Sequence, residues 1–214
     1  MPVKKKSISN LKTAGRPIKK GAVNVREALI TAGVELLKTT RLEDISLRKV
    51  ASEAGVSHVA TYHHFANKQA LFAAMAEVGY RKYFEHYQKE LDKTPQDFKG
   101  RYRALGWTYF QFIMENQQFA RIMFGGTGEL SKLHPSLTAV SRRTYRQLHE
   151  IIRLGQKLGY LQDGQTREKT LASWAMIHGI AMIFLEGRLK MKNDIQEMEI
   201  FIQTVTEYAY NGMK

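Results

Sequence analysis

The side chains best suited to chemistry lie between residues 46 and 68, and most of them donate hydrogen bonds or carry positive charge. Arg48 could donate two parallel hydrogen bonds to a guanine edge, although a plain solvated helix charge is the alternative. Lys68 and the amide of Asn67 stand where a helix is expected to begin, a position that favours a phosphate through charge and helix dipole. The hydroxyl of Tyr62 is another donor for a phosphate oxygen, although a side chain that wedges between helices is the alternative. These groups indicate a surface that contacts a nucleic acid.

Three histidines in the same segment, His58, His63 and His64, raise the question of a metal site. Side chains of adjacent helical residues point about 100° apart, and His58 and His63 are five residues apart, so no pair has the i, i+4 geometry that chelates a metal well. The chain has no cysteine, which excludes disulfides, thiolate zinc sites and a catalytic thiol. We therefore expect neither a metal ion nor another cofactor.

No enzyme motif stands out, so catalysis is not expected. The nearest approach to a phosphate-binding loop is Gly125-Gly126-Thr127-Gly128, and no strand is predicted before it. With 43% apolar and 10% aromatic residues, the chain has the composition of a folded globule. It lacks a run of about eighteen apolar residues, the length that spans a bilayer. We expect a cytoplasmic protein with no membrane partner.

Positive charge is concentrated at the start of the chain. The formal net charge is +13, and residues 1–23 contain seven Lys or Arg residues and no Asp or Glu. A segment of this kind cannot bury enough apolar surface to fold alone, so we expect a basic flexible arm. Two interpretations of the arm remain open. It is either a solubilising tail or a segment that folds onto DNA, with Arg16 beside Pro17 in a minor groove.

The apolar periodicity that follows the arm predicts helices that position these side chains. One helix is expected over residues 25–37, and Ser46 caps a second. Gly55 can adopt the positive φ of a sharp turn, and Ser57 caps a third helix. Asn67 then caps a fourth, which reaches about residue 91. Two short helices separated by a glycine-containing turn form a helix-turn-helix.

The third helix of this motif can enter a major groove, where its N-terminal residues would face base edges and phosphates. Val59 and Ala60 can contact thymine methyl groups but cannot read a base pair by hydrogen bonds, which leaves base specificity to Arg48, His58 and His63. Residues 24–70 are the predicted DNA-binding domain. The predicted contacts with double-stranded DNA are Arg16, Ser46, Arg48, Ser57, His58, Val59, Ala60, Tyr62, His63, Asn67 and Lys68.

One stretch of this motif carries a family resemblance. Gly55-Val56-Ser57-His58-Val59-Ala60-Thr61-Tyr62-His63-His64-Phe65, followed by Asn67-Lys68-Gln69-Ala70-Leu71-Phe72, resembles the DNA-binding domain of TetR-family transcriptional regulators. Thr61 departs from the pattern, because the family usually carries an apolar residue there. Trp174, His178 and Gly179 resemble the Trp-x-x-x-His-Gly signature of one subgroup. The resemblance implies an all-α homodimer whose C-terminal domain binds a small-molecule inducer.

Residues 71–214 are predicted to form this helical ligand-binding and dimerisation domain. Apolar residues recur at helical spacing around 107–123, 135–158, 166–189 and 194–210. Aromatic and Met side chains suit an adaptable pocket between helices, but a plain core has an equal claim to them. The scarcity of charge favours an apolar inducer or a cation that stacks on aromatic rings. The predicted pocket residues are Trp107, Phe110, Met114, Phe119, Met123, Trp174, His178 and Met182.

The last two predicted helices form the expected dimer interface. Residues 166–189 are apolar on most sides, and the final helix carries an apolar stripe. Two such helices from each subunit would make a four-helix interface with two-fold symmetry. The alternative is that one chain covers this surface by itself. The predicted interface residues are Trp174, Ile177, Ile183, Phe184, Ile195, Met198, Ile202 and Val205.

The sequence thus predicts a dimeric, ligand-responsive transcriptional regulator, a repressor rather than an activator, that binds a pseudo-palindromic operator and is released by an inducer. Two other classes remain as alternatives. A basic architectural protein would coat DNA without sequence preference, but it would not need a large apolar C-terminal domain. A small-molecule enzyme or carrier with an incidental helix-turn-helix would bind DNA only through its charge.

Overall fold

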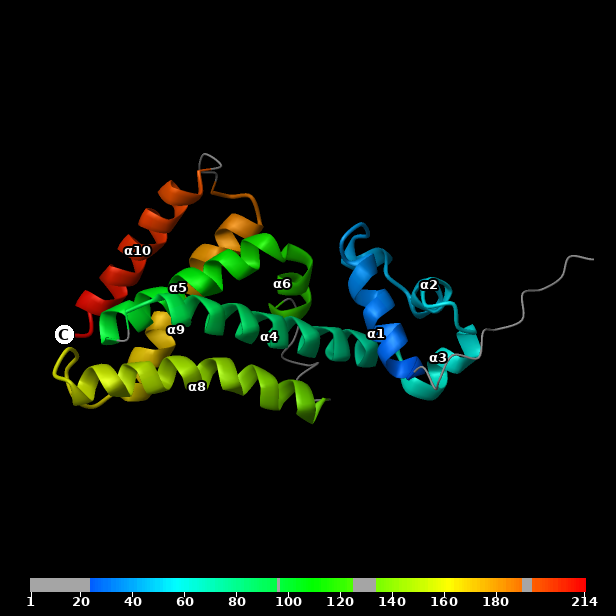
Figure 1. Cartoon of the computed structure of the whole chain (residues 1–214), viewed down its shortest axis with the longest axis horizontal. Helices are drawn as coiled ribbons and strands as arrows, with labels where there is room; N and C mark the ends of the chain where they lie inside the picture. The colour runs from blue at the N-terminus through cyan, green and yellow to red at the C-terminus, as the bar shows by residue number, and fades with distance from the viewer. Residues whose placement is uncertain (1–23, 96, 125–133, 190–193) are drawn as a thin grey trace, which may run out of the picture.

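The computed structural model describes residues 24–95, 97–124, 134–189 and 194–214, and the basic arm, including Arg16, and the Gly125-Gly126 segment lie outside these ranges. Within the described ranges all regular secondary structure is helical, as predicted (Figure 1). No helix in these ranges is long and apolar enough to cross a membrane. The elements are α1 (Val25–Leu36), η1 (Leu42–Asp44), α2 (Leu47–Glu53), α3 (His58–His64), α4 (Lys68–Lys93), α5 (Phe98–Glu115), α6 (Gln117–Phe124), α8 (Pro135–Lys157), α9 (Thr166–Leu185) and α10 (Ile195–Asn211).

The predicted helix-turn-helix is confirmed in α2 and α3. Ser46 and Ser57 cap these helices, with hydroxyls that accept hydrogen bonds from the backbone N–H groups of Lys49 and Ala60 at 3.2 and 3.1 Å. Between the helices Gly55 has φ +66°, which a residue with a Cβ rarely adopts. The helices therefore begin and end where local backbone chemistry requires.

Thr61, the residue that departs from the family pattern, is fully buried in α3. Its hydroxyl donates a hydrogen bond to the carbonyl oxygen of Ser57, 3.4 Å away in the preceding turn. Because the helix itself satisfies the hydroxyl, a polar residue is accommodated at this buried position. Beside it, Val50 and Phe65 are 0% and 2% exposed, so the motif has a closed apolar core.

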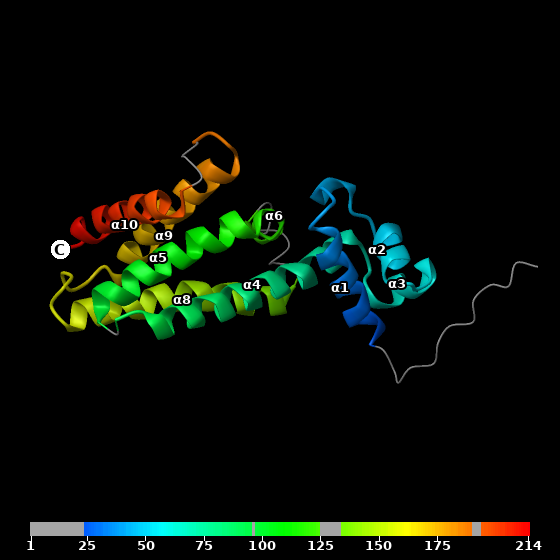
Figure 2. The ribbon, with the colours of Figure 1, turned by 45° about the horizontal axis from the view of Figure 1, so that its top comes forward.

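Helix α4 joins the two halves of the molecule. It has 26 residues and runs from the helix-turn-helix into the C-terminal bundle (Figures 1 and 2). At one end it packs so closely on α1 that a Cβ placed on Gly33 would lie 2.8 Å from the sulfur of Met75. The predicted boundary between residues 70 and 71 falls inside this helix. The two halves are therefore joined by a rigid rod rather than a linker.

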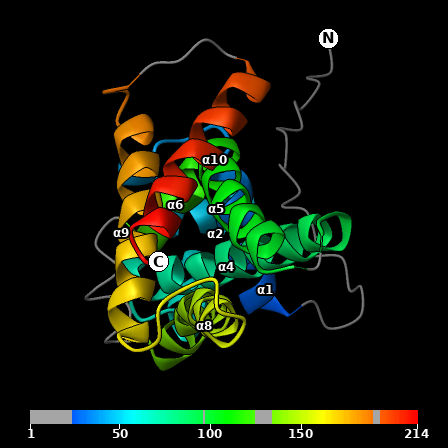
Figure 3. The ribbon, with the colours of Figure 1, turned by 90° about the vertical axis from the view of Figure 1, so that its left-hand side faces the viewer.

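The C-terminal bundle has α5 at its centre. In the end-on view α4 and α8 lie on one side of α5, and α9 and α10 lie on the other (Figure 3). Pro135 opens α8, and Gly159 follows its end with φ +74°. The apolar face expected around residues 107–123 is divided between α5 and α6 at Asn116, whose side chain donates to the carbonyl of Phe112 at 3.0 Å.

Candidate functional site

The N-terminal face of α3 is exposed. Val59 and Tyr62 are 69% and 52% exposed, large values for apolar and aromatic side chains on a folded protein. The ring of His58 meets that of Tyr62 edge-to-face, with 5.0 Å between centroids. Eight predicted DNA contacts are exposed and two, Ala60 and Lys68, are half-buried, whereas Arg16 lies outside the described residues. The eight are Ser46, Arg48, Ser57, His58, Val59, Tyr62, His63 and Asn67.

Two of the predicted phosphate-binding side chains also serve the fold. The Asn67 side-chain oxygen accepts from the backbone N–H of Ala70 at 2.9 Å, so its amide nitrogen is left as the donor. The Lys68 ammonium donates to the carbonyl of Glu43 at 3.1 Å and lies 5.0 Å above the ring of Phe72. Lys68 therefore ties α4 to η1, a role that its position at a helix N-terminus did not suggest.

Arg48 is more exposed than Lys68. It is exposed on α2, and within the described part of the chain it forms no ion pair. Among these same residues no group of three or more His, Asp or Glu side chains could hold a metal ion. The chemistry that this face offers is hydrogen-bond donation, positive charge and short apolar side chains.

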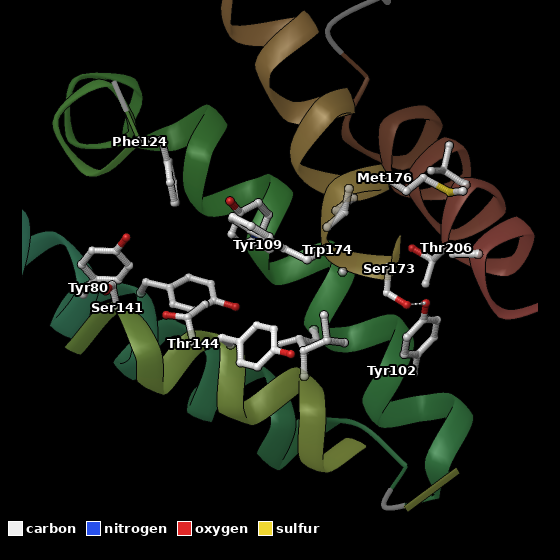
Figure 4. Close-up of a pocket in the computed structure, with 18 of the residues that line it drawn as sticks. Tyr80, Tyr102, Tyr109, Phe124, Ser141, Thr144, Ser173, Trp174, Met176 and Thr206 are labelled. Atoms are coloured by element: carbon white, nitrogen blue, oxygen red, sulfur yellow. Dashed lines mark hydrogen bonds between the residues drawn. The ribbon is translucent and has the colours of Figure 1, made fainter. Parts of the chain in front are cut away.

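A cavity of about 320 Å³ lies within the C-terminal bundle. Six helices contribute to its wall, namely α4, α5, α6, α8, α9 and α10 (Figure 4). Its size is at the lower end of the range for small-molecule sites. The wall is mainly aromatic and aliphatic. The lining residues are Tyr80, Tyr83, Tyr102, Leu105, Gly106, Tyr109, Phe124, Ser141, Arg142, Thr144, Tyr145, Leu148, Ser173, Trp174, Met176, Ile177, Val205, Thr206 and Ala209.

Several polar groups of the wall already have partners. The Tyr102 hydroxyl donates to that of Ser173 at 2.9 Å, as the dashed line in Figure 4 shows. The Tyr109 hydroxyl and Nδ1 of His178 are 2.8 Å apart, a hydrogen bond that holds both rings. Two buried hydroxyls of the wall, on Tyr83 and Thr144, have no partner among the described residues.

Burial keeps these groups uncharged. It raises the pKa of both Tyr80 and Tyr102 to about 12, and it also raises the pKa of Tyr83 and Tyr109 well above the ordinary value of a tyrosine. Burial also lowers the pKa of His178. At neutral pH the tyrosines are therefore protonated hydrogen-bond donors, and the wall carries no charge except at Arg142, which is exposed.

The structure brings few of the eight predicted pocket residues to this cavity. Trp174 lines it, and His178 is joined to it through Tyr109. Phe110, Phe119 and Met123 are buried in the core instead. Three others, Trp107, Met114 and Met182, pack against that core and are partly buried. None of the tyrosines that line the cavity was predicted from the sequence. The available signal was their spacing, since Tyr80 and Tyr83 are three residues apart within the fourth predicted helix.

The outer surface of α9 and α10 is apolar and exposed. Of the predicted interface residues, Trp174, Ile183 and Ile195 are exposed, whereas Ile177, Phe184 and Met198 are half-buried. Ile202 is 0% exposed, so a single chain covers it, and Val205 is half-buried and lines the cavity, as Trp174 and Ile177 also do. Ile202 and Val205 point to the bundle because α10 packs on α5 along that face. Ile200 and Tyr208, on the opposite face, are 66% and 69% exposed and were not predicted.

Both halves of the chain match models of known protein families. Residues 29–75 match the family model for bacterial regulatory proteins of the tetR family, and residues 102–207 match that for a tetracyclin repressor-like C-terminal domain. The nucleoid occlusion factor SlmA of Marinobacter nauticus is 27% identical over 165 residues, which cover 77% of this chain and 82% of that protein. SlmA of Shewanella oneidensis is 25% identical, over 85% of this chain and 94% of that one.

Solved structures share the fold. A protein of unknown function from a Rhodococcus species aligns with a TM-score of 0.75 at 22% identity, over 93% of this chain and 99% of that one. The TetR-family transcriptional regulator PfmR from Thermus thermophilus aligns with a TM-score of 0.63 at 20% identity, over 87% and 98%. With a helix-turn-helix followed by a helical C-terminal domain, each matching its family model, the chain belongs to the TetR family of bacterial transcriptional regulators.

Proposed function

We propose that this chain is a ligand-responsive transcriptional repressor, which binds a pseudo-palindromic operator as a homodimer in the cytoplasm and is released by a small molecule. The observation that carries the proposal is the path of α4. At one end Met75 packs on α1, and about two turns further along Tyr80 and Tyr83 form part of the cavity wall. A molecule in the cavity therefore touches the same rod that supports the DNA-binding motif.

A second route from the cavity supports the same coupling. Phe124, the last residue of α6, lines the cavity, and α6 also contacts η1 next to the helix-turn-helix. A ligand that binds one arrangement of α4 and α6 more tightly than another would shift the population towards it. In a dimer this shift would change the spacing of the two recognition helices and weaken their fit to two half-sites.

Dimerisation would use the exposed face of α9 and α10. Ala172, Ala175, Gly179 and Ile183 follow one face of α9 at three- and four-residue steps. A Cβ added to Gly179 would meet no atom within 4 Å in one protomer, so the face is open and its small residues permit close approach of a partner helix. On α10, Ile200 and Tyr208 share a face at eight-residue spacing. We propose that these residues, with Trp174 and Ile195, pair with the same residues of a second copy.

On DNA, the N-terminal end of α3 would lie in the major groove. Ser57, His58, Val59, Ala60, Tyr62 and His63 would face base edges and phosphates, while Arg48 reads a guanine from α2. Ser46, Asn67 and Lys68 would flank the groove at helix N-termini, where backbone N–H groups favour phosphate. Arg16 would reach a minor groove from the N-terminal arm.

The test is selection of random double-stranded DNA by the purified protein at about 150 mM salt, where non-specific electrostatic binding is suppressed. We expect enrichment of a pseudo-palindrome. On that DNA, Arg48→Ala should lower discrimination at one base pair of each half-site by about 1–3 kcal/mol. Lys49→Ala removes the neighbouring exposed cation and serves as the control, which should leave the selected sequence unchanged. Selection that enriches no sequence would contradict the proposal.

A second candidate function has its own support. The SlmA proteins of Marinobacter nauticus and Shewanella oneidensis, which are similar to this chain, are named nucleoid occlusion factors, and the net charge of +13 suits extended contact with DNA. A protein that organises DNA without sequence preference would bind random fragments with equal affinity. Its binding would fall steeply with salt and would not respond to a molecule in the cavity. The selection experiment separates the two functions.

A further inference from the structure

The unpaired hydroxyl of Tyr83 is the most informative group in the cavity. The Tyr83 side chain is 2% exposed and is held between the rings of Tyr109 and Phe112, with centroids 5.9 and 5.6 Å away. The side chain lines the cavity, and its buried hydroxyl has no partner among the described residues. About nine in ten buried polar groups are hydrogen-bonded, and an unpaired one destabilises a protein. A rigidly held donor of this kind is suited to a ligand.

A second unpaired donor comes from another helix. The Thr144 hydroxyl belongs to α8, which packs beside α4, and it too is buried on the cavity wall with no partner in the described ranges. Figure 4 shows Thr144 and Ser141 on α8 below the cavity, with Phe124, Tyr109 and Trp174 on the other side. The two unpaired hydroxyls therefore belong to α4 and α8, and the aromatic rings of Phe124, Tyr109 and Trp174 come from other helices.

The charge of the wall restricts what can enter. None of the lining residues is Asp or Glu, and the one charged side chain is the guanidinium of Arg142. A cation that left water for this site would find no counter-charge, which costs more free energy than contact with aromatic rings returns at an exposed site. Flat aromatic walls favour a planar molecule, which can stack on them or meet them edge-on.

We propose that the cavity binds an uncharged aromatic molecule that carries a hydrogen-bond-accepting oxygen, with the Tyr83 hydroxyl donating to that oxygen. The proposal deepens the ligand response inferred above and rests on it. It also narrows the choice that the sequence left open between an apolar molecule and a stacking cation. Thr144 is the second donor, placed to bind the same oxygen or another one on the ligand.

Three probes that share one ring system test the chemistry by calorimetry on the purified full-length protein. They are 2-acetylnaphthalene, which has an acceptor oxygen, 2-ethylnaphthalene, which has none, and 2-(aminomethyl)naphthalene, which is a cation at neutral pH. We expect the ketone to bind most tightly and the amine most weakly. Tyr83→Phe removes only the hydroxyl, so it should weaken ketone binding by about two- to tenfold and leave binding of the hydrocarbon unchanged.

Tyr87→Phe is the matched control, because Tyr87 is buried on the same helix but does not line the cavity. It should not change the affinity for the ketone. The melting temperature of Tyr83→Phe should equal or exceed that of the wild type, because the variant loses a hydroxyl that has no partner in the ligand-free protein. A lower melting temperature would show that the hydroxyl is structural and would overturn its assignment to a ligand.

The outcomes separate the two proposals. Tightest binding of the amine, equal binding of the ketone to wild type and Tyr83→Phe, or no binding of any probe would overturn the ligand assignment. If the ketone binds through Tyr83 but saturating ketone leaves the selected DNA bound, the ligand assignment stands and the proposed release of DNA fails. If the ketone does not bind and another molecule releases the DNA, the ligand assignment fails and the proposed release of DNA stands.

Discussion

The N-cap of α3 allows a direct test of the proposed recognition helix. Ser57 accepts a hydrogen bond from the backbone N–H of Ala60 at 3.1 Å, and α3 has only 7 residues, so the cap matters. Asp caps a helix as well as Ser does, whereas Ala costs about 1 kcal/mol of stability. We therefore expect Ser57→Asp to keep the free energy of unfolding within about 0.5 kcal/mol of the wild type, and Ser57→Ala to lower it by about 1 kcal/mol.

The two variants should rank in the opposite order in DNA affinity: Ser57→Asp, the more stable variant, should bind DNA more weakly than Ser57→Ala. Ser57→Asp places a negative charge where the proposed complex has a phosphate. Two unit charges about 5 Å apart interact by about 1–3 kcal/mol when the effective dielectric constant lies between about 80 and 20. Affinity for the selected DNA should then fall by about five- to 150-fold, more than in Ser57→Ala. Urea denaturation measures the stability and fluorescence anisotropy the affinity.

The control replaces an Asp cap by Ser, the opposite of Ser57→Asp, at a helix outside the helix-turn-helix. Asp97 caps α5 by accepting from the backbone N–H of Gly100 at 2.7 Å, and α5 lies in the bundle, away from α3 (Figure 1). Asp97→Ser should keep that cap and leave DNA affinity unchanged. The reasoning about α3 is refuted if Ser57→Asp folds normally and binds the selected DNA as tightly as the wild type.

Three further variants test the packing, the interface and the buried histidine. Gly155→Ala should lower the free energy of unfolding by up to about 2 kcal/mol in urea, because its Cβ would clash with the buried ring of Phe98 and the strain outweighs a helix gain of about 1 kcal/mol; a more stable variant would contradict this packing. Ile200→Glu should shift the light-scattering mass from about twice 24.6 kDa towards 24.6 kDa at micromolar protein, and an unchanged dimer would exclude Ile200 from the interface. Burial lowers the pKa of His178 below 6.5, so the unfolded chain binds a proton at higher pH than the folded one and stability should fall as the pH drops below about 6.5. The melting temperature of His178→Gln should fall less between pH 7.5 and 5.5, and an equal fall would place the pH sensitivity elsewhere.

Local features of the fold could be read from the sequence. Ser46, Ser57, Asn67 and Gly55 each act within about four residues of themselves, through a cap or a positive φ, and the structure confirms all four roles. The break at Asn116 was missed because no Gly or Pro marks it; a side chain that bonds its own helix ends α5 there.

The cavity and the dimer surface could not be read in the same way. Helical periodicity says which face of a helix is apolar, but not which neighbour covers that face or whether the neighbours fill the space. On α10 it placed Ile202 on the apolar stripe, but it could not show that the bundle of the same chain, rather than a partner, buries that residue. Likewise an aromatic residue such as Phe110 fits a core as well as a pocket, and only the packing of six helices decides.

The unbroken course of α4 has a consequence for how the molecule unfolds. Buried residues from Leu29 to Met213 belong to one apolar cluster, so the helix-turn-helix and the bundle share a core. Heating should therefore melt the whole protein in a single calorimetric transition, and a fragment that ends at residue 70 should not fold, because it lacks Leu71 and Met75. By mass action, a ligand bound among the distant tyrosines would then slow hydrogen exchange in the amides of α1 as well.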